Sequence, residues 1–397
     1  MVSNEKIIPI ILLLLIFHSC KSDDSDLYTE PTNGIEISTE TDESNSQIES
    51  NTGESSSVSN ASLEDITSGF RQLMLIYGFP GAQVAITRNN KIVYLESFGK
   101  ADIDAEIAVD DNSQFRIANI SKPITLTAIS KLVADGQLSL NDRVFGPSSI
   151  LGTEFGVLPY DSEEESITIE HLIEHTAGFT NSPFDIMFDD NALTQADLIA
   201  KVLDERSLAS SPGNTYKFSN FGYSVLGRVI EKATGISYES YVKEFILAPM
   251  EISKMTIGVN SKSESTKQEV TYYTNFSNPY INPYGINIKR MDSHGGWIAS
   301  AKDLALFAMK SDNEASIPDL LDPKDKLSYL KRDSWNHNGY LPGSISVLQV
   351  GYPTSYVVLV NKSAPDYLEI IQAIRNFMRE KVEGRTDWPK TDVVNDL

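Results

Sequence analysis

Two pairs of strand-like segments lie near opposite ends of the folded part of this chain, and a long helix-rich stretch separates them. Alternating apolar residues predict strands at residues 84–88 and 92–98, and again at 344–350 and 354–361. If the chain returns to the first pair of strands after the helix-rich stretch, the second pair can join them in one sheet. We therefore predict an α+β fold, with an antiparallel sheet flanked by helices and a helical lobe inserted at about 140–260.

Helical spacing of apolar residues predicts the elements around this sheet. A first helix is expected from Ser62 to a stop at Gly78, and a closing amphipathic helix at 368–382. Residues 119–136 also have a helical pattern, in which Pro123 is tolerated because it falls in the first turn. A folded domain at 62–384 exceeds what one core usually holds, so we expect two lobes.

The N-terminus has the pattern of an export signal. Lys6 precedes the apolar run 7–17, which is too short for the ~20 residues that span a bilayer. The chain's single cysteine, Cys20, follows this run and resembles the lipobox cysteine of bacterial lipoproteins. We expect residues 1–20 to be a lipoprotein signal peptide and Cys20 to be lipidated. An ordinary secretory signal with a chance cysteine is the alternative.

Residues 21–61 are rich in Ser, Thr, Asn, Asp and Glu, and such a segment buries too little apolar area to fold. We predict a disordered acidic tether here and a C-terminal tail at 385–397. The acidic stretch after Cys20 resembles signals that send lipoproteins of Gram-negative bacteria to the cell surface. The expected location is therefore outside the inner membrane, lipid-anchored at the outer membrane or cell surface.

The charge of the chain argues against a nucleic-acid partner. Its 33 Lys and Arg residues stand against 55 Asp and Glu, for a formal charge of −22. No basic stripe is available to neutralise phosphates. With one cysteine, no internal disulfide can form.

Five short motifs follow one another in a fixed order through residues 63–380. Together they resemble the signature segments of the serine β-lactamase and penicillin-binding-protein family. The resemblance implies an α/β lobe and a helical lobe with a cleft between them, and acyl-enzyme chemistry at a serine. The motifs are FRIANISK at 115–122, ITIEHLIEHTAG at 167–178, PG to FSNFGY at 212–223, GGW to DLA at 295–305, and HNGYLPG at 337–343.

Two site positions of this chain differ from the family pattern. The family's first motif reads Ser-x-x-Lys, in which the serine attacks and the lysine takes its proton. Here Asn119 stands at the nucleophile position, at or near a helix N-terminus, and Lys122 is kept. The family's Tyr-x-Asn motif becomes Phe218 at the tyrosine position, with Asn220 retained.

The third motif is kept in its histidine form. The resemblance assigns His337 as a donor to the ligand and Gly339 as its neighbour on the same strand. It also implies an oxyanion hole made by the backbone N–H groups of Asn119 and Tyr340. Trp297 and Trp335 either line the cleft or pack in the core; the pattern does not decide.

With Asn119 and Phe218 at these positions, the chain lacks the attacking hydroxyl and the phenol that relays its proton. We therefore predict an impaired member, a pseudoenzyme with little or no activity, which binds peptide, acyl or β-lactam-like ligands. Lys122 is interpreted as an anion hook beside the cleft. The expected ligand is a peptidoglycan-like peptide or an acyl group, with a protein partner as another option; no cofactor is expected.

Two alternatives to the pseudoenzyme remain open. One is an active hydrolase, such as an esterase, a D-amino-acid peptidase or a β-lactamase-like enzyme, with another nucleophile. Among nearby hydroxyls, Ser121 is expected to face the core and Ser219 to point away from Phe218, while Tyr216 could reach the cleft. The other alternative is a surface scaffold whose cleft binds nothing.

His171 and His175 with Glu174 also match the H-x-x-E-H pattern of inverted zinc peptidases. Two histidines four apart on one helix can bind zinc. However, Gly178 ends that helix, and a third ligand is not evident in the sequence. We therefore predict no metal site.

Overall fold

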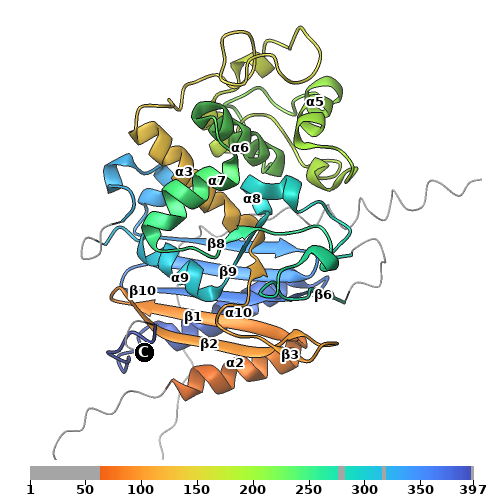
Figure 1. Cartoon of the computed structure of the whole chain (residues 1–397). Helices are drawn as coiled ribbons and strands as arrows, with labels where there is room; N and C mark the ends of the chain where they lie inside the picture. The colour runs from red at the N-terminus through yellow and green to blue at the C-terminus, as the bar shows by residue number, and fades with distance from the viewer. Residues whose placement is uncertain (1–62, 276–281, 315–318, 395–397) are drawn as a thin grey trace, which may run out of the picture. The chain divides into compact units, whose positions relative to one another are not determined.

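The computed structural model describes residues 63–275, 282–314 and 319–394. Its largest sheet has six strands in the order β3-β2-β1-β10-β9-β8 (Figure 1). The strands nearest the N-terminus pair with those nearest the C-terminus through β1 and β10, where Val84 lies opposite Val358. The predicted antiparallel sheet built from both chain ends is confirmed. The strands are β1 (Gly81–Arg88), β2 (Lys91–Asp102), β3 (Ile107–Ala108), β8 (Ser334–Leu341), β9 (Ser344–Gly351) and β10 (Thr354–Val360).

Both faces of this sheet are covered. Along β1, Val84 and Ile86 belong to a buried apolar cluster shared with α2 (Glu64–Tyr77) and α10 (Tyr367–Val382). Ala85 between them belongs to a second cluster, shared with the inserted helices. Successive side chains of a strand point to opposite faces, so nearly every position of the central strands is apolar.

Between β3 and α10, the described residues form seven α-helices and two small sheets. The first small sheet has the order β4-β7-β5 and the second pairs β6 with β11. The elements are α3 (Ser121–Ala134), α4 (Ile169–Ile173), α5 (Gln195–Glu205), α6 (Asn220–Thr234), α7 (Tyr238–Val242), α8 (Asp292–Gly295), α9 (Ala301–Met309), β4 (Phe115–Arg116), β5 (Thr256–Ile257), β6 (Tyr273–Thr274), β7 (Trp297–Ala299) and β11 (Lys362–Ser363).

The inserted region is less helical than the sequence predicts. Long connections run before α4 and between α4 and α5, where positive φ angles at Gly146, Gly152 and Gly178 turn the backbone. Glycine adopts these conformations without steric cost, so loops rather than helices carry the neighbouring apolar residues into the core. The buried side chains of the region are still those of the apolar pattern.

Helix ends follow the expected signals closely. Helix α2 ends at Tyr77 and is capped by Gly78, which adopts a left-handed φ of 62°, and α3 begins at Ser121 after a 3₁₀ turn at Ala118–Ile120. Ser62, the signal segment with Cys20, and the tether at 21–61 lie outside the described residues. Within the described ranges, no helix has the length and apolar character needed to cross a membrane.

Candidate active site

The turn that carries Asn119 is held against the edge of the sheet. Ser346 Oγ, on β9, donates a hydrogen bond of 2.9 Å to the carbonyl oxygen of Ile117. On β8, a Cβ atom at Gly339 would lie 2.2 Å from that same oxygen and 2.1 Å from Ser346 Oγ. No side chain fits there, so a glycine at 339 lets β8 pack directly on the turn. Asn119 is thereby fixed between the sheet and α3.

Lys122 lies at the centre of the site, and its side chain is 1% exposed. Its Nζ donates to Asn119 Oδ1 at 2.8 Å, to Asn220 Oδ1 at 2.7 Å, and to the carbonyl oxygen of His294 at 3.3 Å. These three acceptors all belong to the protein. The geometry therefore does not support the interpretation of Lys122 as an anion hook, because its side chain is buried and directed at protein oxygens.

Asn220 is oriented by a carboxylate that the sequence analysis missed. Asn220 Nδ2 donates to Asp185 Oδ2 at 2.6 Å, and the backbone N–H of Met187 donates to Asp185 Oδ1 at 3.0 Å. Asp185 is 2% exposed. Burial raises the pKa of its carboxyl, against the lowering effect of both hydrogen bonds and of the Lys122 charge. Asp185 thus fixes the Asn220 amide with its oxygen toward Lys122.

Aromatic rings lie beside Lys122. Nζ is 4.8 Å from the ring centroid of Phe218 and 5.5 Å from that of Tyr223, within the range of cation–π attraction. The imidazole of His175 is tilted by 37° against the ring of Phe218, with centroids 4.8 Å apart, and its Nδ1 accepts from the backbone N–H of Ser219 at 3.2 Å. Burial first, and then the charges of Lys122 and His337, lower the pKa of His175 to about 3. His175 is therefore neutral at physiological pH.

His337 lies on β8 with a phenol beside it. The hydroxyl of Tyr329 donates to the carbonyl oxygen of Asn336 at 2.5 Å and lies 3.1 Å from His337 Nδ1. Since the phenol hydrogen is directed at Asn336, the oxygen of Tyr329 can accept from Nδ1 of His337. Tyr329 therefore holds the imidazole ring in place, a role that no motif of the sequence indicated.

Tyr340 follows Gly339 on β8, the outermost strand of the sheet on this side. Its ring stacks on Tyr367 of α10, with ring centroids 3.8 Å apart. The side chain is thus on the α10 face, while Gly339 contacts the Asn119 turn. The oxyanion role of the Tyr340 and Asn119 backbone N–H groups stays a prediction.

The nearby hydroxyls have structural partners. Ser121 is fully buried and its Oγ accepts from the backbone N–H of Trp297 at 3.3 Å. Ser219 Oγ accepts from the backbone N–H of Gly222 at 3.2 Å and caps α6. Tyr216 is 48% exposed and its ring meets His175 edge-on at 5.6 Å. Ser121 and Ser219 are thus engaged within the fold, and Asn119 takes the position beside Lys122.

The geometry also settles two smaller questions. Trp297 and Trp335 are both buried, and the indole N–H of Trp297 donates to Tyr238 at 3.0 Å, so both pack in the core.

The H-x-x-E-H pattern does not lie on one helix. Helix α4 ends at Ile173, before His175, so His175 does not share a helix with His171. His171 Nδ1 instead accepts from the Thr168 backbone N–H at 3.3 Å. No set of side chains suited to a metal ion occurs in the described parts of the chain.

Comparison with known proteins agrees with this geometry. The chain is 27% identical to Protein flp of Staphylococcus aureus (strain MW2) over 258 residues, which are 64% of this chain and 48% of that protein. It is 30% identical to Esterase EstB of Burkholderia gladioli over 234 residues, 56% of this chain and 57% of the esterase. The chain thus spans about half the length of the curated relatives it matches.

Among solved structures, the octameric penicillin-binding protein homologue from Pyrococcus abyssi superposes with a TM-score of 0.60. The two are 24% identical, and the match covers 79% of this chain and 77% of that one. The shared fold is the mixed one described above, with an antiparallel sheet and flanking helices. The model of the Beta-lactamase family matches residues 66–375. This chain belongs to the Beta-lactamase family.

Proposed function

We propose that this chain is a member of the family in which acyl transfer is disabled, and that its cleft binds a peptide or acyl ligand without a covalent intermediate. The observation that carries the proposal is the 2.8 Å hydrogen bond from Lys122 Nζ to Asn119 Oδ1. It places an amide oxygen where the family pattern has the attacking hydroxyl.

The chemistry of the amide supports this. The oxygen of Asn119 accepts a hydrogen bond from Lys122, and an amide nitrogen has no free lone pair for attack on a carbonyl carbon. Lys122 Nζ is directed at the oxygens of Asn119, Asn220 and His294 rather than at a reacting hydroxyl. Phe218 offers no hydroxyl in place of the family's tyrosine. The site therefore lacks both the nucleophile and the phenol of the family pattern.

The expected loss of rate is large. Removing the nucleophile of a serine hydrolase costs up to ~10⁶ in turnover, while binding and the oxyanion hole retain perhaps ~10³–10⁴ over water. Losing the proton-transfer group as well adds little, because such residues act as a unit. Turnover by this chain is therefore expected to be barely measurable.

Groups that could hold a ligand remain. The Asn119 amide, the backbone N–H groups at 119 and 340, and the imidazole of His337 are donors or acceptors near one turn of the chain. One relative is named an esterase and one solved structure a penicillin-binding protein homologue, so acyl esters and peptides of the peptidoglycan type are the ligand classes to test. A protein partner is the next candidate.

The test is covalent labelling with a fluorescent penicillin and a fluorophosphonate. We expect no labelling of the wild type or of Asn119→Ala, and labelling of the double variant Asn119→Ser/Phe218→Tyr. Adding Lys122→Met to the double variant is the matched control and should abolish the label. Stoichiometric labelling of the wild type would refute the proposal and favour an active hydrolase with another nucleophile.

Non-covalent binding needs its own measurement. Thermal-shift assays with muropeptides and with β-lactams should raise the melting temperature of the wild type if the cleft binds them. Absence of any shift, together with absence of labelling, would leave the scaffold alternative.

We also propose that the protein is anchored through Cys20 to the outer membrane or cell surface. The support is the apolar run at 7–17 followed by the chain's single cysteine. Mass spectrometry of the membrane fraction should find acyl chains on the wild type. A Cys20→Ala variant that remained membrane-bound would contradict the anchor.

A further inference from the structure

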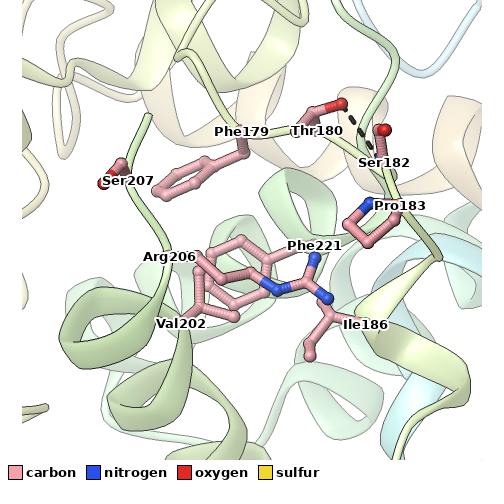
Figure 2. A pocket seen from close by; sticks show the side chains of 9 residues that line it. All are labelled: Phe179, Thr180, Ser182, Pro183, Ile186, Val202, Arg206, Ser207 and Phe221. Carbon is pink, nitrogen blue, oxygen red and sulfur yellow. Dashed lines mark hydrogen bonds between the residues drawn. The ribbon is translucent and has the colours of Figure 1, made fainter. Parts of the chain in front are cut away.

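A pocket of about 210 Å³ lies next to the Lys122 cluster. Figure 2 shows the side chains that line it. Asp185 and Asn220 bond to each other beside Lys122, and the residue after each of them, Ile186 and Phe221, lines the pocket. The lining residues are Phe179, Thr180, Ser182, Pro183, Ile186, Val202, Arg206, Ser207 and Phe221.

The walls of the pocket are mainly apolar. The rings of Phe179 and Phe221 meet edge to face with centroids 4.8 Å apart, and Ile186 and Val202 extend this surface. The hydroxyl oxygen of Thr180 accepts from the backbone N–H of Ser182 at 3.1 Å. An apolar ligand body would thus find two aromatic rings and two aliphatic side chains.

One cation, Arg206, enters this apolar pocket. It follows the last residue of α5, and Figure 2 shows its guanidinium end directed toward Pro183 and Ile186. Its two terminal nitrogens contact the carbonyl oxygen of Phe184 at 3.4 and 3.5 Å, at the long end of the hydrogen-bond range. Its guanidinium carbon also lies 4.8 Å from the Phe184 ring centroid.

No carboxylate of the described ranges forms an ion pair with Arg206. Three carboxylates act on Arg206 through their charge. Of these, Asp189 pairs with Lys201 at 2.6 Å, Asp185 bonds to Asn220, and Glu205, the preceding residue, is exposed to solvent. Arginine remains charged even when half-buried, and its planar fork matches a carboxylate. The pocket therefore holds a positive charge whose donors are only weakly satisfied by the protein.

We propose that this pocket binds a small apolar carboxylate, with the carboxylate on Arg206 and the apolar body between Phe179 and Phe221. At about 210 Å³ the pocket is smaller than the ~300–1,000 Å³ of sites for drug-sized ligands. It suits an acid with a single ring or a short branched chain. This site is separate from the Lys122 cluster and does not depend on the proposed function.

The test compares phenylacetate with its neutral analogue phenylacetamide on the full chain, by isothermal titration calorimetry or ligand-observed NMR. We expect phenylacetate to bind about ten- to a hundredfold more tightly, as a charge-assisted hydrogen bond to arginine would give. Arg206→Gln should remove this preference. Arg379→Gln, at an exposed arginine of α10, is the matched control and should retain it. Equal binding of the two compounds, or a preference that survives in Arg206→Gln, would overturn the proposal.

A second measurement uses the wild type, in case Arg206→Gln does not fold. Phenylglyoxal modifies accessible arginines, and peptide mapping gives the rate at each one. Phenylacetate should slow the modification of Arg206 at least about fivefold and leave that of Arg379 unchanged. Equal rates at Arg206 with and without phenylacetate would show that Arg206 only clamps Phe184.

Discussion

Asp185 offers the sharpest test of how the site is built, because its replacement by asparagine conserves shape and changes chemistry. Both carboxylate oxygens accept from N–H donors, one from Asn220 Nδ2 at 2.6 Å and one from the Met187 backbone at 3.0 Å. An amide has a single oxygen. In Asp185→Asn the new NH₂ group must therefore face one of these two donors, whichever way it is turned.

The size of the effect follows from the kind of hydrogen bond lost. Bonds to a charged group contribute about 1.5–3 kcal/mol, and a buried donor left unsatisfied costs about 1–3 kcal/mol. We expect Asp185→Asn to lower the free energy of unfolding by about 2 kcal/mol at pH 8, measured by urea denaturation. Asp135→Asn, in an exposed i,i+4 pair with Lys131, is the control and should change it by less than ~0.5 kcal/mol.

The pH dependence gives the same experiment a second readout. Burial raises the pKa of Asp185, so the native carboxyl holds its proton more tightly than the unfolded one. The stability that this group contributes therefore falls as pH rises from about 4 through the raised pKa, and the gap to Asp185→Asn narrows over that window. A gap that widens with rising pH would refute the dominance of burial. Equal stability of the two proteins at pH 8 would refute the hydrogen-bond assignment itself.

Three further predictions concern neighbouring residues. Lys122→Met removes the donor from three acceptors and should cost about 3 kcal/mol in urea unfolding, against less than ~1 kcal/mol for Lys131→Met on the surface. Gly339→Ala places a Cβ 2.2 Å from the Ile117 carbonyl oxygen, so calorimetry should show a loss of about 1–3 kcal/mol; an unchanged melting temperature would contradict the packing of β8 on the turn. Because the pKa of His175 is lowered to about 3 in the native state, wild-type stability should fall as pH drops from 7 to 4, and His175→Phe should flatten that dependence in urea midpoints measured across the range.

Local patterns predicted four of the six strands of the large sheet, β1, β2, β9 and β10, but not the short β3, while β8 was implied only by the family motif. The expected strands at 344–350 and 354–361 match β9 and β10 within a residue, because their apolar runs fill both cores and end at Gly351 and Pro353. The end of α2 before Gly78 could also be predicted, because glycine adopts the left-handed conformation of a helix cap at no steric cost. The inserted region was predicted less well, since its buried residues are held by loops whose course depends on tertiary packing.

The residues of the site could be predicted from the sequence only where they belong to a family motif. Asn119, Lys122 and Asn220 come together as the family pattern implies, with Lys122 Nζ 2.8 Å from Asn119 Oδ1 and 2.7 Å from Asn220 Oδ1. Asp185 is one of three acidic residues within 185–190, and no spacing relates it to Asn220, 35 positions later. Tyr329 beside His337 was missed for the same reason: its role arises from a contact between a 3₁₀ turn and β8.

The two substituted positions, Asn119 and Phe218, both contact Lys122. Three hydrogens of Nζ meet the oxygens of Asn119, Asn220 and His294, and the ring face of Phe218 lies 4.8 Å away. Amide and carbonyl oxygens accept hydrogen bonds but do not take up protons near neutral pH, and an aromatic face attracts the cation. None of these four groups takes up a proton near neutral pH, so none replaces the phenol of the family's tyrosine. Asn119→Ser restores an attacking hydroxyl but leaves no phenol at position 218 to pass on its proton, so this variant should react with a fluorescent penicillin far more slowly than Asn119→Ser/Phe218→Tyr. Equal rates for the single and double variants would show that proton transfer from Ser at position 119 needs no phenol at position 218.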